Sequence, residues 1–232
     1  MTATESASRT ARERARTELT REIKEEARRQ LAAHGAQGLS LRAVARELGM
    51  VSSALYRYFP SRDELLTALI IDAYDALGSA AEAASAGLPA AEARGRWRAV
   101  CGAVRDWALA HPHEYALIYG SPVPGYQAPQ ATIASAVRVV RVLGGLLTSA
   151  CAAGDEPPPP LPPALGEQAA IVADAIAPDV PGAVILRGLT AWTQLFGMIS
   201  FELFGQFIGS LDPADEFFGY AVEQMADFVG IP

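Results

Sequence analysis

The stretch from Ser40 to Pro60 constrains the fold of this chain more than any other part of its sequence. Ser40 is suited to cap the start of a helix, and Gly49 stands where that helix should end. Ser52 is placed to cap the next short helix through Tyr58, which Pro60 cannot continue because proline lacks an N–H donor. Two helices of about two turns each, joined by a short turn that contains glycine, form a helix-turn-helix arrangement.

The second of these short helices has an inward and an outward face. Leu55 and Phe59 lie four residues apart and therefore share the inward face. A longer helix is predicted from about residue 10 to residue 34, with an apolar stripe that can pack beneath them: Leu19, Ile23, Ala27 and Leu31. The outward face of the short helix keeps the polar side chains Ser52, Ser53, Tyr56 and Arg57. An outward tyrosine and arginine argue against a purely structural role for this stretch.

The rest of the chain shows helical periodicity and no alternating β pattern of useful length, which predicts an all-α fold. Further helices are expected at about residues 61–77, 90–110, 112–120, 129–153, 164–176, 182–208 and 213–229. We divide the chain into a disordered arm (1–9), a three-helix helix-turn-helix domain (10–60) and a larger helical domain (61–232). Within the larger domain, residues 61–78 form a connecting helix and residues 154–163 a proline-rich linker, which we prefer to a docking site for a proline-recognition domain.

Charge is distributed unevenly along the chain. Of its 232 residues, those from Arg9 to Arg62 include 12 basic and six acidic residues, whereas the chain as a whole has a net charge of −7. A basic N-terminal module attached to an acidic body suits a protein that presents one end to a polyanion, although a helix covered in ion pairs would have a similar composition.

The sequence also indicates where the protein acts. The N-terminus lacks the apolar region of a signal peptide, and no apolar run approaches the roughly 20 residues that span a bilayer, so we predict a cytoplasmic protein without membrane contact. Cys101 and Cys151 are far apart in apolar surroundings, which favours buried free thiols over a disulfide or a metal site.

Motifs of catalysis are missing from the sequence. His111, His113 and Glu114 cluster around a proline, but their spacing does not match a helical zinc motif. Ser121 lacks the G-x-S-x-G elbow, and neither a phosphate-binding loop nor a dinucleotide-binding glycine motif is present. We therefore predict no enzyme activity, no catalytic residues, no metal and no cofactor.

The residue types of the short helices suit contact with DNA. Ser52 and Ser53 can donate to or accept from base edges, and Arg57 can reach guanine or phosphate. Tyr56 and Tyr58 carry hydroxyls on short stiff arms, which suit phosphate oxygens. A structural three-helix cluster with solvated charges is the alternative reading.

The segments Leu39-Ser40-Leu41-Arg42-Ala43-Val44-Ala45-Arg46-Glu47-Leu48-Gly49 and Ala54-Leu55-Tyr56-Arg57-Tyr58-Phe59-Pro60-Ser61-Arg62-Asp63-Glu64-Leu65-Leu66 closely resemble the DNA-binding end of TetR-type transcriptional regulators. The resemblance covers about residues 10–75. It implies that Ser40 and Arg42 meet the DNA from the first short helix, and that Tyr58 and Arg62 hold phosphates. It also implies that the major groove is read or clamped by Ser52, Ser53, Tyr56 and Arg57. The implied partners are a palindromic double-stranded operator and a second copy of the chain.

By the same resemblance, the second half of the chain senses a ligand and forms the dimer. Candidate residues for an apolar or aromatic effector pocket are Trp97, Cys101, Val104, Trp107, Tyr119, Val140, Leu143, Leu147, Trp192 and Phe196. Candidate dimer contacts on the last two helices are Phe201, Phe204, Phe217, Phe218, Val222 and Met225. Two alternatives remain: a helix-turn-helix regulator without an effector, and an all-α carrier or enzyme for hydrophobic molecules.

Overall fold

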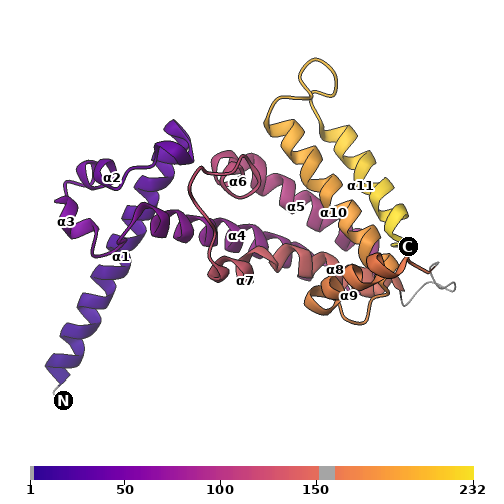
Figure 1. Ribbon diagram of the computed structural model, residues 1–232, viewed down its shortest axis with the longest axis horizontal. Helices are drawn as coiled ribbons and strands as arrows, with labels where there is room; N and C mark the ends of the chain where they lie inside the picture. The colour runs from indigo at the N-terminus through magenta and orange to yellow at the C-terminus, as the bar shows by residue number, and fades with distance from the viewer. Residues whose placement is uncertain (1–2, 152–159) are drawn as a thin grey trace. The chain divides into compact units, whose positions relative to one another are not determined.

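The computed structural model describes residues 3–151 and 160–232, and within these ranges every regular element is helical (Figure 1). In chain order the elements are α1 (Ala3–His34), η1 (Ala36–Gly38), α2 (Leu41–Glu47), α3 (Ser52–Leu55), α4 (Arg62–Ala86), α5 (Ala93–Ala110), α6 (Pro112–Tyr119), η2 (Gln130–Thr132), α7 (Ile133–Ala136), α8 (Arg138–Cys151), α9 (Pro163–Ile176), α10 (Gly182–Leu203) and α11 (Asp215–Val229). The predicted all-α fold class is confirmed.

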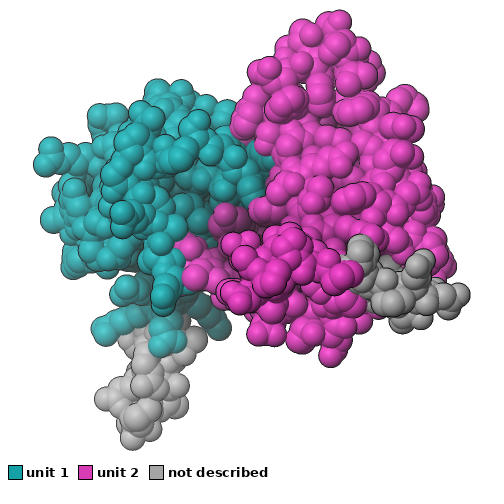
Figure 2. All heavy atoms as spheres, turned by 45° about the vertical axis from the view of Figure 1, so that its right-hand side comes forward, with its two compact units in different colours: residues 1–72, 113–130 teal, residues 73–112, 131–232 magenta. Residues whose placement is uncertain are grey.

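The helices form two compact units, drawn in different colours in Figure 2. The first unit consists of residues 1–72 and 113–130, and the second of residues 73–112 and 131–232. This division differs from the expected boundary at residue 60 in two respects. The first turns of α4 belong to the N-terminal unit, and so do most of α6 and the loop that follows it.

The core of the first unit explains this division. Leu55 of α3 is fully buried and Phe59 is 7% exposed, as their helical phase predicts. They pack in one cluster with the inward stripe of α1 and with the start of α4: Ile23, Ala27, Leu31, Leu65, Leu66 and Leu69. Leu117, Val123 and Tyr126 of the later segment cover the same cluster. Because burial of apolar area drives folding, residues 113–130 are structural members of the N-terminal unit.

In the second unit α10 packs against α5, α8, α9 and α11. Arg105 of α5 is 8% exposed and is held by Glu202 through Nε and Nη2, at 2.8 and 2.6 Å. Its Nη1 donates to Asp215 at 2.9 Å, and its guanidinium lies 4.9 Å from the ring centroid of Phe218. A buried guanidinium needs such a full set of partners, so Arg105 ties α5 to both α10 and α11.

Several helix limits differ from the prediction. Residues 1–9 are expected to form a disordered arm, but α1 begins at Ala3, and no glycine or proline interrupts the chain from there to His34. The helix expected over 182–208 ends at Leu203, because Gly205 follows in the left-handed region with φ of 77°.

The connecting helix is longer than predicted, and the helix expected over 129–153 is broken. α4 continues to Ala86, and a Cβ on Gly78 would lie 2.7 Å from Cβ of Arg138, so the missing side chain lets α8 approach. Three shorter elements replace the single helix: η2, α7 and α8. Arg138, the first residue of α8, forms ion pairs with Asp75 and Glu82 of α4. Of the expected linker 154–163, residues 154–159 lie outside the described residues, and Pro162 precedes α9 in an extended conformation.

One described helix, α10, is long and apolar enough to cross a membrane by length and composition, which contradicts the expectation that no apolar run approaches that length. In its most apolar stretch 39% of the residues are buried inside the protein, and core helices of soluble proteins pass the same test. Residues 130–136 and 138–148 pass only as a pair bent by 42°.

Candidate nucleic-acid interface

The start of α2 is fixed by two hydrogen bonds at Ser40. Its Oγ accepts from the N–H of Ala43 at 3.4 Å, which makes Ser40 the N-cap that the sequence predicts. Its own N–H donates to Oε1 of Gln30 on α1 at 3.3 Å. An N-cap of this kind stabilises a helix by about 1 kcal/mol. Arg42, two residues further on, is exposed and has no ion pair with any described residue.

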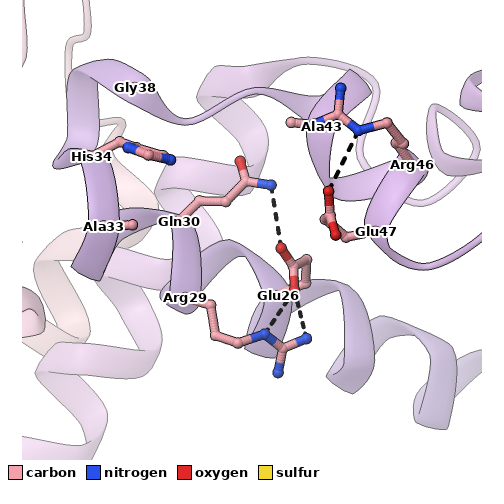
Figure 3. Close-up of a pocket in the computed structure, with 9 residues that line it drawn as sticks. All are labelled: Glu26, Arg29, Gln30, Ala33, His34, Gly38, Ala43, Arg46 and Glu47. Carbon is pink, nitrogen blue, oxygen red and sulfur yellow. Dashed lines mark hydrogen bonds and ion pairs between the residues drawn. The ribbon is translucent and has the colours of Figure 1, made fainter.

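Gln30 is itself held by a buried carboxylate (Figure 3). Its Nε2 donates to Oε1 of Glu26 at 3.4 Å, and Nε of Arg29 donates to Oε2 of Glu26 at 2.7 Å. Glu26 and Gln30 are 6% and 7% exposed and lie in a pocket of about 360 Å³ between α1 and α2. Neither Glu26 nor Gln30 is among the site residues predicted from the sequence. Their four-residue spacing next to the apolar stripe of α1 is the signal that could have found them.

The turn between α2 and α3 depends on Gly49, whose φ of 64° lies in the left-handed region. The N–H of Gly49 donates to the carbonyl of Arg46 at 3.1 Å, and the N–H of Met50 donates to the carbonyl of Ala45 at 2.8 Å. Contrary to prediction, the N-cap of α3 is Val51 and not Ser52, and Val51 offers no side-chain hydrogen bond. The side chain of Ser52 is therefore not used as the cap of α3.

α3 is shorter than predicted but presents the predicted faces. It ends at Leu55, because the N–H of Arg57 donates to the carbonyl of Ala54, three residues back, at 3.2 Å and does not continue the four-residue pattern. Ser53 and Arg57 are exposed, Tyr56 is 40% exposed, and Ser52 is half-buried at the start of the helix. Arg42 of α2 is exposed as well, so both short helices carry polar side chains at the surface while Leu55 lies in the core.

Tyr58 is half-buried, because it packs on the core of the first unit. The predicted phosphate contact is one that its hydroxyl group would make. The guanidinium carbon of Arg16, on α1, lies 5.5 Å from the centroid of the Tyr58 ring. This separation is within the range of a cation–π interaction. The contact brings the N-terminal half of α1 beside the end of the α3 turn.

Arg62, which is predicted to hold a phosphate, is bound in the structure by groups of the protein. Its Nη2 donates to the carbonyl of Ala36 at 2.8 Å, and its Nε donates to the carbonyl of Leu39 at 3.2 Å. Nη1 lies 3.8 Å from a carboxylate oxygen of Asp63. The three nitrogens thus face groups of the protein itself, and the arginine ties α4 to the turn that precedes α2.

Nine of the ten predicted effector residues belong to the second unit, whereas Tyr119 belongs to the first, where its ring lies 5.3 Å from that of Tyr115. Seven of the ten are buried: Trp97, Cys101, Val104, Trp107, Leu143, Leu147 and Phe196. Trp192 is half-buried, and its indole nitrogen is buried. Val140 is half-buried. Trp97 donates from Nε1 to the carbonyl of Val222 at 3.0 Å, which makes it a packing residue.

Two details of this group bear on a ligand. Burial raises the pKa of the Cys101 thiol, so it is an unreactive buried thiol, as predicted. Trp192 Nε1 is buried and has no hydrogen-bond partner among the described residues, and its ring lies 5.5 Å from that of Phe196. The side chain of Cys151 lies outside the described part of the structure.

The predicted dimer residues divide by helical phase. Phe218, Val222 and Met225 of α11 are 7%, 3% and 1% exposed, because they face the interior of their own unit, so the prediction that they are free for a partner is contradicted. Phe201 and Phe204 are 55% and 50% exposed. Phe217, also a predicted dimer residue, is half-buried and lies on the outward side of α11 with the exposed Tyr220 and Phe228.

Aromatic contacts join these exposed residues. The ring of Phe207 lies 5.9 Å from that of Phe201 and 5.6 Å from that of Phe217, both in edge-on geometry. Among the described residues no group of three or more His, Cys, Asp or Glu side chains could hold a metal ion.

Comparison with known proteins agrees with this geometry. Residues 23–69 match the family described as bacterial regulatory proteins of the tetR family, and residues 97–225 match the tetracyclin repressor-like C-terminal domain. HTH-type transcriptional regulator Rv1816 of Mycobacterium tuberculosis (strain H37Rv) is 41% identical over 198 residues, which cover 83% of this chain and 84% of that protein. HTH-type transcriptional regulator Mb1846 of Mycobacterium bovis matches with the same figures.

Solved structures agree as well. The crystal structure of the regulatory protein SCO4313 has a TM-score of 0.75 at 35% identity, covering 93% of this chain and 98% of that one. A protein of unknown function from Rhodococcus sp. RHA1 has a TM-score of 0.70 at 27% identity, over 91% of this chain and 95% of the other. The chain belongs to the TetR family of helix-turn-helix transcriptional regulators, which bind double-stranded DNA operators.

Proposed function

We propose that the protein is a cytoplasmic repressor that binds a palindromic operator as a homodimer, with Ser53, Tyr56 and Arg57 at the DNA. The observation that carries this proposal is the exposure of these three side chains on α3 and the turn that follows it, while Leu55 of the same segment is buried. Exposed hydroxyl and guanidinium groups at this position have the chemistry of major-groove readout. Ser40, Arg42, Ser52 and the hydroxyl of Tyr58 flank them, and we assign those groups to the sugar–phosphate backbone.

The experiment is a double change, Tyr56→Ala with Arg57→Ala, measured on duplex fragments that the wild-type protein recovers from genomic DNA. We expect the affinity for the recovered sequence to fall about 30-fold or more, since each good contact contributes about 1–3 kcal/mol. Arg141→Ala, which removes an exposed arginine of the second unit, is the matched control and should leave affinity unchanged. Equal loss in both variants, or in neither, would refute the proposed interface.

The dimer is proposed to form through the exposed faces of α10 and α11. Support comes from Phe201, Phe217, Tyr220 and Phe228, four large apolar side chains that the packing of the second unit leaves wholly or partly uncovered. An apolar area of this kind, presented by two neighbouring helices, suits self-association with a second copy. To read a palindrome, such a dimer must present its two recognition helices about 34 Å apart, one turn of DNA.

An effector is proposed to bind beside Trp192 in the second unit and to release the operator. The unpartnered indole N–H of Trp192, beside the ring of Phe196, supports an aromatic or apolar compound that carries one hydrogen-bond acceptor. Neither catalysis nor a cofactor is needed for this function. A library of hydrophobic compounds is the test: a compound that releases wild-type protein from its operator should lose potency against Trp192→Phe, which keeps a ring but removes the donor. Operator affinity that no compound changes would favour the alternative, a regulator without an effector.

A further inference from the structure

Some arginines of α1 form ion pairs with acidic residues, and others do not. After residue 17 each arginine and lysine of α1 has an acidic partner: Arg21 pairs with Glu18 and Glu25, Lys24 and Arg28 with Asp72, and Arg29 with Glu26. Arg12, Arg14 and Arg16 are exposed, and none pairs with an acid among the residues whose side chains the structure describes. Unpaired positive charge on α1 is therefore concentrated in its N-terminal half.

This half of α1 lies beside the proposed DNA surface. The Arg16 guanidinium is stacked at 5.5 Å on the ring of Tyr58, whose hydroxyl we assign to the DNA backbone. Figure 1 shows α1 continuing past α3 toward the N-terminus. At 1.5 Å per residue, Arg12 lies about 6 Å from Arg16 along the axis of α1, further toward the N-terminus.

Helical phase separates the three arginines into two faces. At about 100° per residue, Arg12 lies about 40° from Arg16 and Arg14 about 160° away. Arg12 and Arg16 thus share the face beside Tyr58, with Glu13 about 60° from Arg16 as the one acid near them. Two cations and one anion leave that face net positive, whereas Arg14 points away from it.

We propose that Arg12 and Arg16 form a second DNA-contact surface, which binds phosphates of the duplex outside the bases that α3 reads. The inference rests on the proposed DNA-binding function and extends it from the α3 region to two arginines of α1, about 6 Å apart along the helix axis. An anionic duplex fits better than an acidic protein partner, because the surface is continuous through Tyr58 with a group of residues already assigned to DNA.

The test is the salt dependence of binding to a labelled 40-base-pair duplex of mixed sequence, followed by fluorescence anisotropy between 50 and 200 mM NaCl. Each phosphate contact contributes about −0.9 to the slope of log K against log salt concentration. We expect Arg12→Ala with Arg16→Ala to reduce the magnitude of the slope by about 1.8 per protomer. Arg14→Ala, a charge change on the other face of the same helix, should alter the slope by much less.

Two further variants keep the outcomes distinct. Arg12→Lys with Arg16→Lys keeps both charges and should restore the wild-type slope. If wild-type protein binds no duplex, the proposed function itself fails. If wild type binds and Tyr56→Ala with Arg57→Ala weakens binding, but the Arg12/Arg16 double variant keeps the wild-type slope, this inference alone is overturned. An equal effect of Arg14→Ala would likewise overturn it in favour of a general charge effect.

Discussion

Arg62 donates through Nη2 to the carbonyl oxygen of Ala36, 2.8 Å away and 26 residues earlier in the chain. Its Nε donates to the carbonyl of Leu39 at 3.2 Å, so one planar guanidinium holds both ends of the short segment before α2. Two donors in a fixed fork can serve two carbonyls at once, which a single ammonium group cannot reproduce. Arg62 therefore sets where the helix-turn-helix begins.

Arg62→Lys separates this positioning role from direct phosphate contact. We expect the variant to lower the free energy of unfolding by about 1–3 kcal/mol, because lysine lacks the planar fork that holds both carbonyls at once. Urea denaturation monitored by circular dichroism measures this change. The salt slope of DNA binding should stay at its wild-type value, since a positioning residue neutralises no phosphate. A variant of unchanged stability whose salt slope has decreased would instead identify Arg62 as a phosphate contact.

Gly49→Ala should destabilise the turn between α2 and α3. An L-residue at φ of 64° costs about 1–2 kcal/mol, although no atom lies within 4 Å of the added Cβ. Gly102→Ala is the matched control, since Gly102 lies within helix α5, also with nothing within 4 Å. We expect that control to gain about 1 kcal/mol. Urea midpoints that move in the same direction for both would contradict the assignment of strain to the turn.

Glu223 should make the second unit sensitive to acid. The guanidinium groups of Arg98 and Arg94 lower the pKa of Glu223 from its usual 4.5 to about 2. A carboxyl group whose folded pKa is depressed contributes stability above its unfolded pKa and loses that contribution as pH falls to its folded pKa. Wild type should therefore exceed Glu223→Gln in stability by its largest margin above pH 4.5, and the margin should close between pH 4.5 and 2. Denaturation midpoints from pH 7 to 2 measure it, and a margin independent of pH would contradict the ion-pair assignment.

Phe201→Glu with Tyr220→Glu should convert the proposed dimer into a monomer. Both side chains are more than half exposed, at 55% and 64%, so the change places charges in the proposed interface without disturbing the core. Sedimentation velocity measures the outcome. Ile171→Glu on α9, at a site that is 72% exposed, is the control and should leave the oligomeric state unchanged. A dimer that persists in the double variant would place the interface elsewhere.

Local patterns in the sequence predicted most of the helices and the burial of the helix-turn-helix core. Leu55 and Phe59 were assigned to the core, and Ser53, Tyr56 and Arg57 to the surface, from helical phase alone. Phase depends on residues a few positions apart, which the sequence shows directly. These predictions were therefore the accurate ones.

Contacts between distant residues could not be read in the same way. The bond from Ser40 to Gln30 spans 10 residues, and those of Arg62 span 23 and 26. α11 also has two apolar stripes, and composition alone does not say which of them its own unit covers. For this reason the sequence predicts a partner contact for Phe218, Val222 and Met225, which are core residues.

Residues 113–130 are far in sequence from the helix-turn-helix, yet they cover its core through Leu117, Val123 and Tyr126. Tyr126 also shares a hydrogen bond of 2.8 Å with Thr67, and Glu114 forms an ion pair with Arg28 at 3.0 Å. The N-terminal DNA-binding unit is therefore not made of residues 1–72 alone. In a chimera that takes only residues 1–72 from another regulator, the core of that regulator must pack against residues 113–130 of this chain. Recombination can therefore transfer DNA specificity intact only when both segments are exchanged together.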